Sequence, residues 1–188
     1  MVSRPSRIMD LQADVLRGHA LLAGMQLDVF TALGAGAATV GDVAQRLGVR
    51  EDKLAPLLYA LVVAGLLEHR DGGFVNTAEA REFLVKGGPR YMGGVHEAWS
   101  EAWQATLKTA QSIRAGAPAA RLDFADHSDE HTAGLLRGPY PTTLAFGRML
   151  AEHFDFGAAG SVIDIGGGSG GVTGRAVRTI RAASCHAV

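Results

Sequence analysis

The chain has 188 residues, 47% of them hydrophobic and 20% charged, which is the composition of a soluble globular protein with one ordinary domain or two small ones. Its formal net charge of −1 argues against a bulk electrostatic attraction to nucleic acid or to an anionic membrane surface. A single cysteine, with neither a signal peptide nor an apolar run long enough to span a bilayer, predicts a cytoplasmic protein.

Residues 8–33 are predicted to form one long helix, because apolar residues recur there at spacings of three, four and seven. More apolar residues fall on the other faces. The two sets are Leu11, Val15, Leu22, Met25, Val29 and Leu33, and Leu21, Leu27 and Phe30. A helix this apolar needs a partner, and a second subunit is the expected one.

The segment 39–76 predicts a winged helix. Thr39 and Asp42 have the spacing of a capping box that opens a helix, and Gly48 is expected to close that helix. A second helix is expected at about 51–64. Two short strands should follow as a hairpin around residues 70–73, and Asn76 and Glu79 then look like the cap of a further helix.

The charges of this winged helix argue against DNA binding. From Thr39 to Val85 the chain carries five basic and seven acidic residues, and the helix that would enter a groove offers only Lys53 among apolar side chains. A groove-reading helix needs several cationic or amide side chains for phosphate and base contacts. Packing against a second subunit is the better use of so apolar a helix.

The middle of the chain predicts two helical stretches separated by a polar loop. Trp99, Trp103 and residues up to Ile113 have near-helical spacing, either as core or as the wall of an aromatic pocket, and Gly116 should end that helix. Residues 121–132 are expected to form a loop, and Leu135 to Phe154 a second helix whose start is broken by Pro139 and Pro141. His127 and His131 lie in or beside this loop. They are four residues apart, as in a metal site, but a solvated loop explains them equally well and we assign no metal.

The main chemical signal lies after residue 160. Val162, Ile163 and Ile165 predict a short strand buried in a parallel sheet, and a glycine-rich loop follows directly. Glycines let a backbone turn sharply and approach a ligand closely. Apolar residues from Val172 to Ile180 then predict a helix that packs back on the strand, and Cys185 falls in a second expected strand.

Spacing alone leaves the ligand of this loop open. Glycines 166, 168 and 171 fit the dinucleotide fingerprint G-x-G-x-x-G, so NAD and S-adenosylmethionine (SAM) both remain, as does a plain strand-to-helix turn. Asp164 favours SAM. The pattern Asp164-x-Gly166-x-Gly168-x-Gly170 resembles motif I of class I SAM methyltransferases, in which the strand-end carboxylate helps to hold the loop and the amino-acid end of the cofactor.

Taken together, the chain resembles the N-terminal half of the bacterial natural-product O-methyltransferases, relatives of the plant caffeate-type enzymes. The segments 21–33, 40–67 and 162–171 carry the resemblance. It implies a mainly α N-terminal winged-helix dimerisation domain followed by the start of an α/β Rossmann-like SAM-binding domain. The expected parts are a dimerisation domain at 1–88, a helical linker region at 89–157 and the first βαβ segment of a methyltransferase domain, cut short, at 158–188.

The resemblance further implies a homodimer that methylates a hydroxyl of an aromatic polyketide or phenolic, with SAM as cofactor. A second polypeptide completing the methyltransferase fold is a further expected partner. The expected cofactor residues are Asp164, Gly166, Gly167, Gly168, Ser169 and Gly170, with Tyr140 and Met149 as weaker candidates. The family's ribose-binding acid and catalytic histidine have no counterpart up to residue 188, so no catalytic residue is assigned and these residues alone are expected to be inactive.

Two alternatives to an O-methyltransferase stay open. One is a non-catalytic dimerisation or partner protein. The other is a methyltransferase-like scaffold that carries out different chemistry, which the fold by itself does not exclude.

Overall fold

A computed structural model describes the whole chain except residues 1–4, 93–94, 121–126, 157–160, 175–183 and 188. The chain divides into two compact units, Met1–Gly93 and Gly94–Val188, and the two are described separately. No helix among the described residues is both long and apolar enough to cross a lipid bilayer.

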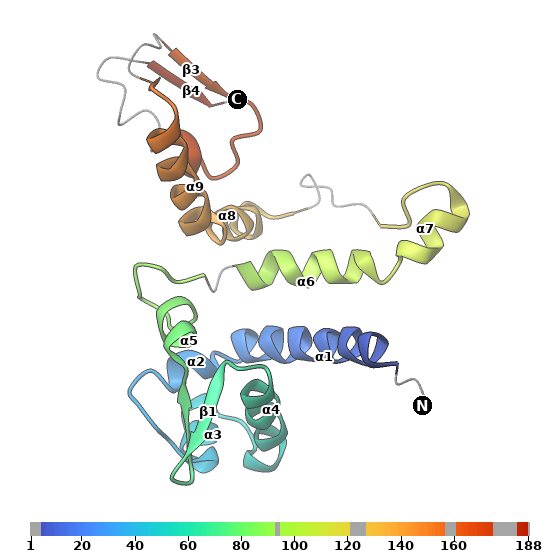
Figure 1. Cartoon of the computed structure of the whole chain (residues 1–188), viewed down its shortest axis with the longest axis vertical. Helices are drawn as coiled ribbons and strands as arrows, with labels where there is room; N and C mark the ends of the chain where they lie inside the picture. The colour runs from blue at the N-terminus through green and yellow to red at the C-terminus, as the bar shows by residue number, and fades with distance from the viewer. Residues whose placement is uncertain (1–4, 93–94, 121–126, 157–160, 175–183, 188) are drawn as a thin grey trace. The chain divides into compact units, whose positions relative to one another are not determined.

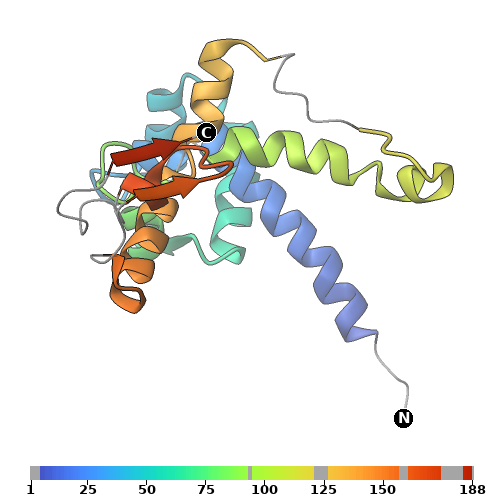
Figure 2. The same ribbon diagram turned by 90° about the horizontal axis from the view of Figure 1, so that it is seen from above.

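The first unit opens with α1 (Ser6–Gln26), which Figures 1 and 2 both show as one straight helix. The predicted single helix over 8–33 is wrong at its end, because Asp28 adopts a left-handed conformation (φ 65°) and a separate short helix, α2 (Val29–Ala32), follows. Asp is one of the few residues that tolerate this conformation. Its carboxylate accepts a hydrogen bond from Lys86 Nζ at 2.7 Å. The break turns Val29 and Phe30 into the core.

The winged helix is present as predicted in outline: α3 (Val40–Leu47), α4 (Glu51–Val63), β1 (Leu67–Arg70) and β2 (Gly73–Asn76). The Thr39–Asp42 capping box and the left-handed Gly48 cap of α3 are both confirmed. The hairpin is tighter than predicted, because Arg70 pairs with Gly73 and only Asp71 and Gly72 form the turn. Both have positive φ, as a two-residue type I′ turn requires.

The predicted cap role of Asn76 is wrong. Asn76 is the last residue of β2, and Thr77 caps the next helix, α5 (Ala78–Phe83). The Asn76 side chain is 3% exposed and donates a hydrogen bond from Nδ2 to the Phe30 carbonyl at 2.8 Å. It therefore joins the wing to α2 through its Nδ2 donor, and this hydrogen bond stabilises the fold because the buried donor would otherwise be unpaired.

The core of the first unit lies between α2, α3, α4 and the hairpin. Its largest fully buried side chains are Phe30, Phe74, Leu33, Leu58, Leu61, Leu67, Val29 and Val43. The C-terminal part of α1 reaches this core, where a Cβ on Gly24 would lie 3.1 Å from the Leu61 side chain. The N-terminal part of α1 does not, and its apolar side chains stay exposed: Ile8, Met9, Leu11, Val15 and Leu16.

The second unit begins with a helical stretch that has a break the sequence analysis missed. The helix expected to run to Gly116 divides into α6 (Val95–Thr106) and α7 (Thr109–Ala115), although Gly116 does cap it. The predicted loop at 121–132 is wrong in its last part, where α8 (Asp129–Arg137) begins, and residues 121–126 lie outside the described residues. Next comes α9 (Tyr140–His153), separated from α8 at Gly138 and Pro139.

Two parallel strands follow, β3 (Ser161–Asp164) and β4 (Ser184–Ala187), with Val162 opposite Cys185 (Figures 1 and 2). The predicted strand is thus confirmed, except that Ile165 lies just beyond its end and that Ile163 is 66% exposed rather than buried. Residues 171–174 are helical, as predicted, and the rest of that expected helix lies outside the described residues. The fold class expected from the sequence, a helical winged-helix domain followed by the beginning of an α/β domain, is confirmed.

Candidate functional site

The loop after β3 has a conformation that only glycine adopts readily. Gly166, Gly168 and Gly170 have φ of 74°, 53° and 70°, in the left-handed region that disfavours side chains. The amide of Gly170 donates to the Gly167 carbonyl at 2.8 Å, which closes a tight turn, and the amide of Gly174 donates to the Gly170 carbonyl as helical residues begin. The alternation of glycines seen in the sequence therefore builds a compact, bare-backboned loop.

Asp164, at the end of β3, braces this loop from within. Its carboxylate accepts a hydrogen bond from the hydroxyl of Thr173, which is 4% exposed. A Cβ on Gly167 would lie 2.8 Å from the same carboxylate, so the loop backbone passes directly over it. Asp164 is not among the residues that line the neighbouring pocket. Its position agrees with the loop-holding part of the role expected from the sequence.

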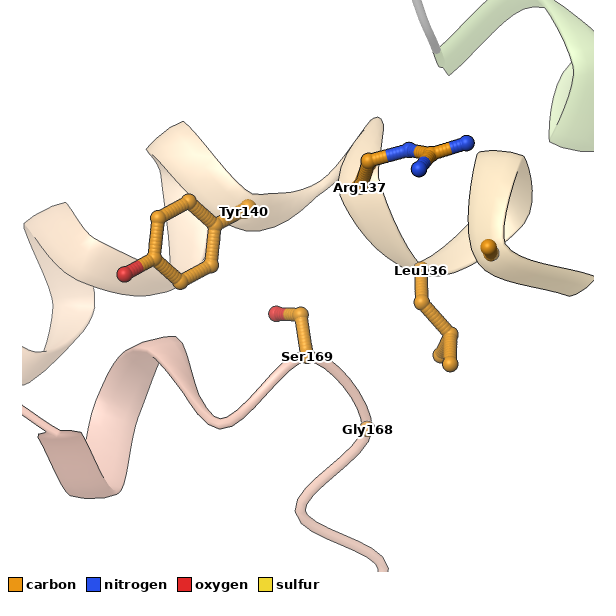
Figure 3. A pocket seen from close by; sticks show the side chains of 6 residues that line it. Leu136, Arg137, Tyr140, Gly168 and Ser169 are labelled. Atoms are coloured by element: carbon orange, nitrogen blue, oxygen red, sulfur yellow. The ribbon is translucent and has the colours of Figure 1, made fainter.

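A pocket of about 420 Å³ lies between the glycine loop and the helices before it (Figure 3). It is lined by Ala133, Leu136, Arg137, Tyr140, Gly168 and Ser169. The volume falls within the range of small-molecule sites, and the walls combine apolar surface with a few polar groups, as such sites do. Arg137 is the one charged residue in this lining, and the Arg137 side chain extends away from Ser169 in Figure 3.

The pocket brings together some of the predicted site residues. Gly168, Ser169 and Tyr140 line it, while Gly166, Gly167 and Gly170 shape the loop behind it. Met149 does not line it and is 48% exposed, nine residues further along α9 than Tyr140.

Sequence reasoning missed the contribution of α8. Ala133 and Arg137 are four residues apart on one face of α8, and Tyr140 is the first residue of α9, just after the break at Gly138 and Pro139. This spacing was a readable signal. It was hidden because the sequence predicted a loop up to residue 132 and because Gly138 and Pro139 interrupt the helical pattern.

The loop is also held from the side of α9. Thr143 Oγ1 lies 3.1 Å from Ser169 Oγ, and the same Thr143 hydroxyl donates to the Tyr140 carbonyl at 2.9 Å. Gly171 passes so close to α9 that a Cβ there would lie 2.1 Å from Thr143 Oγ1. Tyr140 and Thr143 lie on the same helix, so the helix that supplies a wall of the pocket also contacts the glycine loop.

The histidines give no metal site in the part of the chain that the structure describes, where no three His, Cys, Asp or Glu side chains gather closely enough to hold an ion. His127 precedes α8 and His131 lies within it.

Comparison with known proteins assigns the first unit. Residues 9–86 match the family of O-methyltransferase dimerisation domains. This part of the chain is an O-methyltransferase dimerisation domain. The long helix and winged helix described above are therefore the two main parts of that domain, and the resemblance inferred from the sequence is confirmed.

Similar proteins extend the likeness beyond the dimerisation domain. The 3-hydroxy-5-methyl-1-naphthoate 3-O-methyltransferase of Streptomyces sahachiroi is 31% identical over 174 residues, 88% of this chain and 50% of that enzyme. The N,N-dimethyltransferase OxyT of Streptomyces rimosus is 27% identical over 93% of this chain and 53% of its own length. The chain thus spans about half the length of the curated relatives it matches.

A solved structure shares the fold of both units. Human N-acetylserotonin methyltransferase, determined in complex with SAM, aligns with a TM-score of 0.81 at 20% identity, over 99% of this chain and 59% of that one. An identity this low shows the fold alone. The fold shared with that structure includes β3 and the glycine loop that follows it.

Proposed function

We propose that this chain forms the dimerisation domain and the cofactor loop of a SAM-dependent O-methyltransferase that acts on a hydroxyl of an aromatic polyketide or phenolic natural product. The observation that carries the proposal is the pocket between the glycine loop and helices α8 and α9, in a chain whose first 86 residues include an O-methyltransferase dimerisation domain.

The residues around the pocket fit the amino-acid end of SAM. Gly168 exposes its backbone at the pocket wall. Any other residue at this position would have to adopt a left-handed φ, which side chains disfavour. The Arg137 guanidinium can form paired hydrogen bonds with a carboxylate, and to do so here it would have to turn toward the loop from the position drawn in Figure 3. Tyr140 supplies an apolar wall with a polar tip. Bound SAM supplies an electrophilic methyl group, and the described residues bind and orient its carrier.

The proposed acceptor is a hydroxyl on an aromatic ring. The naphthoate enzyme, the more similar of the two relatives, is named for O-methylation, whereas OxyT is named for N-methylation. Holding the acceptor next to the methyl group accounts for much of the rate in such a reaction, because proximity and orientation replace a bimolecular encounter.

The test uses the full protein and SAM with a labelled methyl group. We expect micromolar or tighter SAM binding by calorimetry and label transfer to a hydroxy-1-naphthoate. An amino-1-naphthoate serves as the amine arm, and a Gly168→Val variant serves as the loop-defective control. Binding without transfer to any phenol or amine would favour the non-catalytic alternative, and absence of SAM binding would refute the cofactor assignment.

We also propose a homodimer formed through the dimerisation domain. The N-terminal half of α1 exposes five apolar side chains, Ile8, Met9, Leu11, Val15 and Leu16, on a unit whose core is otherwise closed. A second copy would cover this apolar surface. Ile163 on β3 and Ile165 just beyond it are 66% and 89% exposed, which is unusual for a parallel strand and the residue that follows it. Further protein, including the second polypeptide considered above, would lie against them.

A further inference from the structure

Two hydroxyl groups meet where α9 passes the glycine loop, and a neighbouring carbonyl oxygen lets us infer the direction of the hydrogen bond between them, which the positions of the two oxygens alone leave open. Thr143 Oγ1 donates to the Tyr140 carbonyl oxygen, 2.9 Å away, and lies 3.1 Å from Ser169 Oγ. A carbonyl oxygen only accepts, and a hydroxyl has one proton to donate. With the Thr143 proton directed at Tyr140, the bond between the hydroxyls is one in which Ser169 donates and Thr143 accepts.

This direction determines what Ser169 offers to the pocket. With Thr143 as the donor to Tyr140, the only proton of the Ser169 hydroxyl is used in the bond to Thr143, and the lone pairs of the Ser169 oxygen remain for a ligand. Ser169 lines the pocket, so it is an acceptor there and not a donor. Chained hydrogen bonds also polarise one another, which strengthens the acceptor at the open end.

Packing keeps the two hydroxyls together. Gly171 lies against α9 so closely that a built Cβ would come within 2.1 Å of Thr143 Oγ1 and 3.1 Å of the Leu144 nitrogen. Neither the loop nor this turn of α9 has room to shift toward the other. The half-buried position of both hydroxyls limits competition from water.

We propose that Thr143 is a positioning residue that makes Ser169 a hydrogen-bond acceptor for the cationic α-ammonium group of the cofactor's amino-acid end. The inference rests on the proposed SAM site and adds to it a division of labour: Arg137 is suited to the carboxylate, and Ser169 to the ammonium. A hydrogen bond from an ammonium to a hydroxyl oxygen is charge-assisted and is stronger than a neutral one.

The experiment measures calorimetric binding to the full protein of two ligands that differ in one group. The first is S-adenosylhomocysteine, which carries the α-ammonium. The second is its analogue with hydrogen in place of the amino group. Thr143→Val keeps the side-chain shape and removes the hydroxyl, whereas Thr143→Ser keeps the hydroxyl. Thermal unfolding of each variant reports whether the fold is intact.

We expect Thr143→Val to weaken S-adenosylhomocysteine about five- to tenfold and to change binding of the deaminated analogue less than about twofold. Thr143→Ser should bind both ligands as the wild type does. Ser169→Ala should show the same selective loss, and Thr143→Val should add nothing in that background.

Equal weakening of both ligands would overturn the inference, because it would mean that Thr143 only supports the fold of the loop. Unchanged binding of S-adenosylhomocysteine by Thr143→Val would overturn it as well. A wild-type protein that binds neither ligand would instead refute the proposed SAM site, and the inference with it.

Discussion

The two units of the chain differ in how far they bury their own apolar side chains. In the first unit the helices and the hairpin close around a continuous core that contains all of the largest fully buried side chains of the described residues. In the second, Leu135 is the buried hydrophobic residue among those described, while Phe146, Met149, Phe154, Ile163 and Ile165 are exposed. The first unit therefore has the core of an independent domain, and the second has the surfaces of one that needs further protein around it.

The two units also differ in the kind of interaction that holds their secondary-structure elements and loops in place. The first depends on hydrophobic packing, with one buried amide, Asn76, bridging to α2. The candidate site in the second depends on hydroxyl contacts and bare glycines: Thr173 to Asp164, and Thr143 to Ser169. Packing resists small changes in solvent conditions, whereas a loop held by a few polar contacts is sensitive to single-atom changes. The predictions below test this contrast.

The largest effect is expected from the same substitution made in each core. Leu58→Ala should lower the free energy of unfolding by about 2–5 kcal/mol, because Leu58 is fully buried on α4 and its truncation leaves a cavity. Leu135→Ala, at a residue 7% exposed on α8, should lower it by less than about 2 kcal/mol, since its surroundings can relax. Urea unfolding followed by circular dichroism measures both. Lys53→Ala, exposed on α4, is the control, and equal losses at Leu58 and Leu135 would contradict the contrast.

The second-largest effect is expected on the dissociation constant of the proposed dimer. Leu16 is 71% exposed on α1, and Leu16→Glu should raise the dimer dissociation constant by about a hundredfold, because an unpaired charge would be buried at the interface. Sedimentation equilibrium measures the constant. Asp10→Lys, a change of charge at an exposed position on the opposite face of α1, is the control. A wild-type monomer at micromolar concentration would show that α1 is not the interface.

The third effect concerns the glycine loop. Gly171→Ala should weaken SAM binding about tenfold, because the new Cβ would have to displace Thr143 Oγ1 from a position 2.1 Å away and overpacking of this kind costs about 1–3 kcal/mol. Gly174→Ala is the control, since a Cβ there meets nothing within 4 Å. Calorimetric titration of SAM into the full protein compares the two. Indistinguishable affinities would mean that α9 does not hold the loop.

Features fixed by neighbouring residues were predictable from the sequence. The capping box at Thr39, the Gly48 cap and the glycine alternation at 166–170 each follow from the backbone preferences of a few adjacent residues. The strand before the glycines was predictable for the same reason, as was the likeness to O-methyltransferases, which rests on the order of these local parts.

Features fixed by distant residues were not predictable. The break at Asp28 depends on Lys86, 58 positions away, and the role of Asn76 depends on a carbonyl 46 positions away. Arg137 and Thr143 belong to the candidate site because α8 and α9 lie next to the glycine loop. In each case the contact is made with a residue far away in the sequence. The spacing of apolar residues indicates which face of a helix or strand a residue occupies, but not which residue lies opposite that face.

The smallest effect is expected from the Asp42 carboxylate at the start of α3, and it depends on pH. Asp42 accepts hydrogen bonds from the Thr39 hydroxyl at 2.7 Å and the Thr39 amide at 3.0 Å. These bonds hold the pKa of Asp42 below its ordinary value of 3.8, with the side-chain bond the larger cause and Arg46 a lesser one. A carboxyl whose pKa is lower in the folded state stabilises the fold above its unfolded pKa. That contribution disappears as the pH falls through the pKa of the folded state.

Asp42→Asn should therefore lower Tm slightly at pH 7, and the difference from wild type should shrink as the pH falls below about 4. Thr39→Ala, which removes the N-cap itself, should cost about 1 kcal/mol and keep most of that loss at low pH, because the bond from the Asp42 amide to Thr39 Oγ1 does not titrate. Thermal unfolding of the three proteins from pH 7 down to pH 2.5 measures the profiles, and an Asp42→Asn difference that stays constant across this range would show that the carboxylate charge does not support the cap.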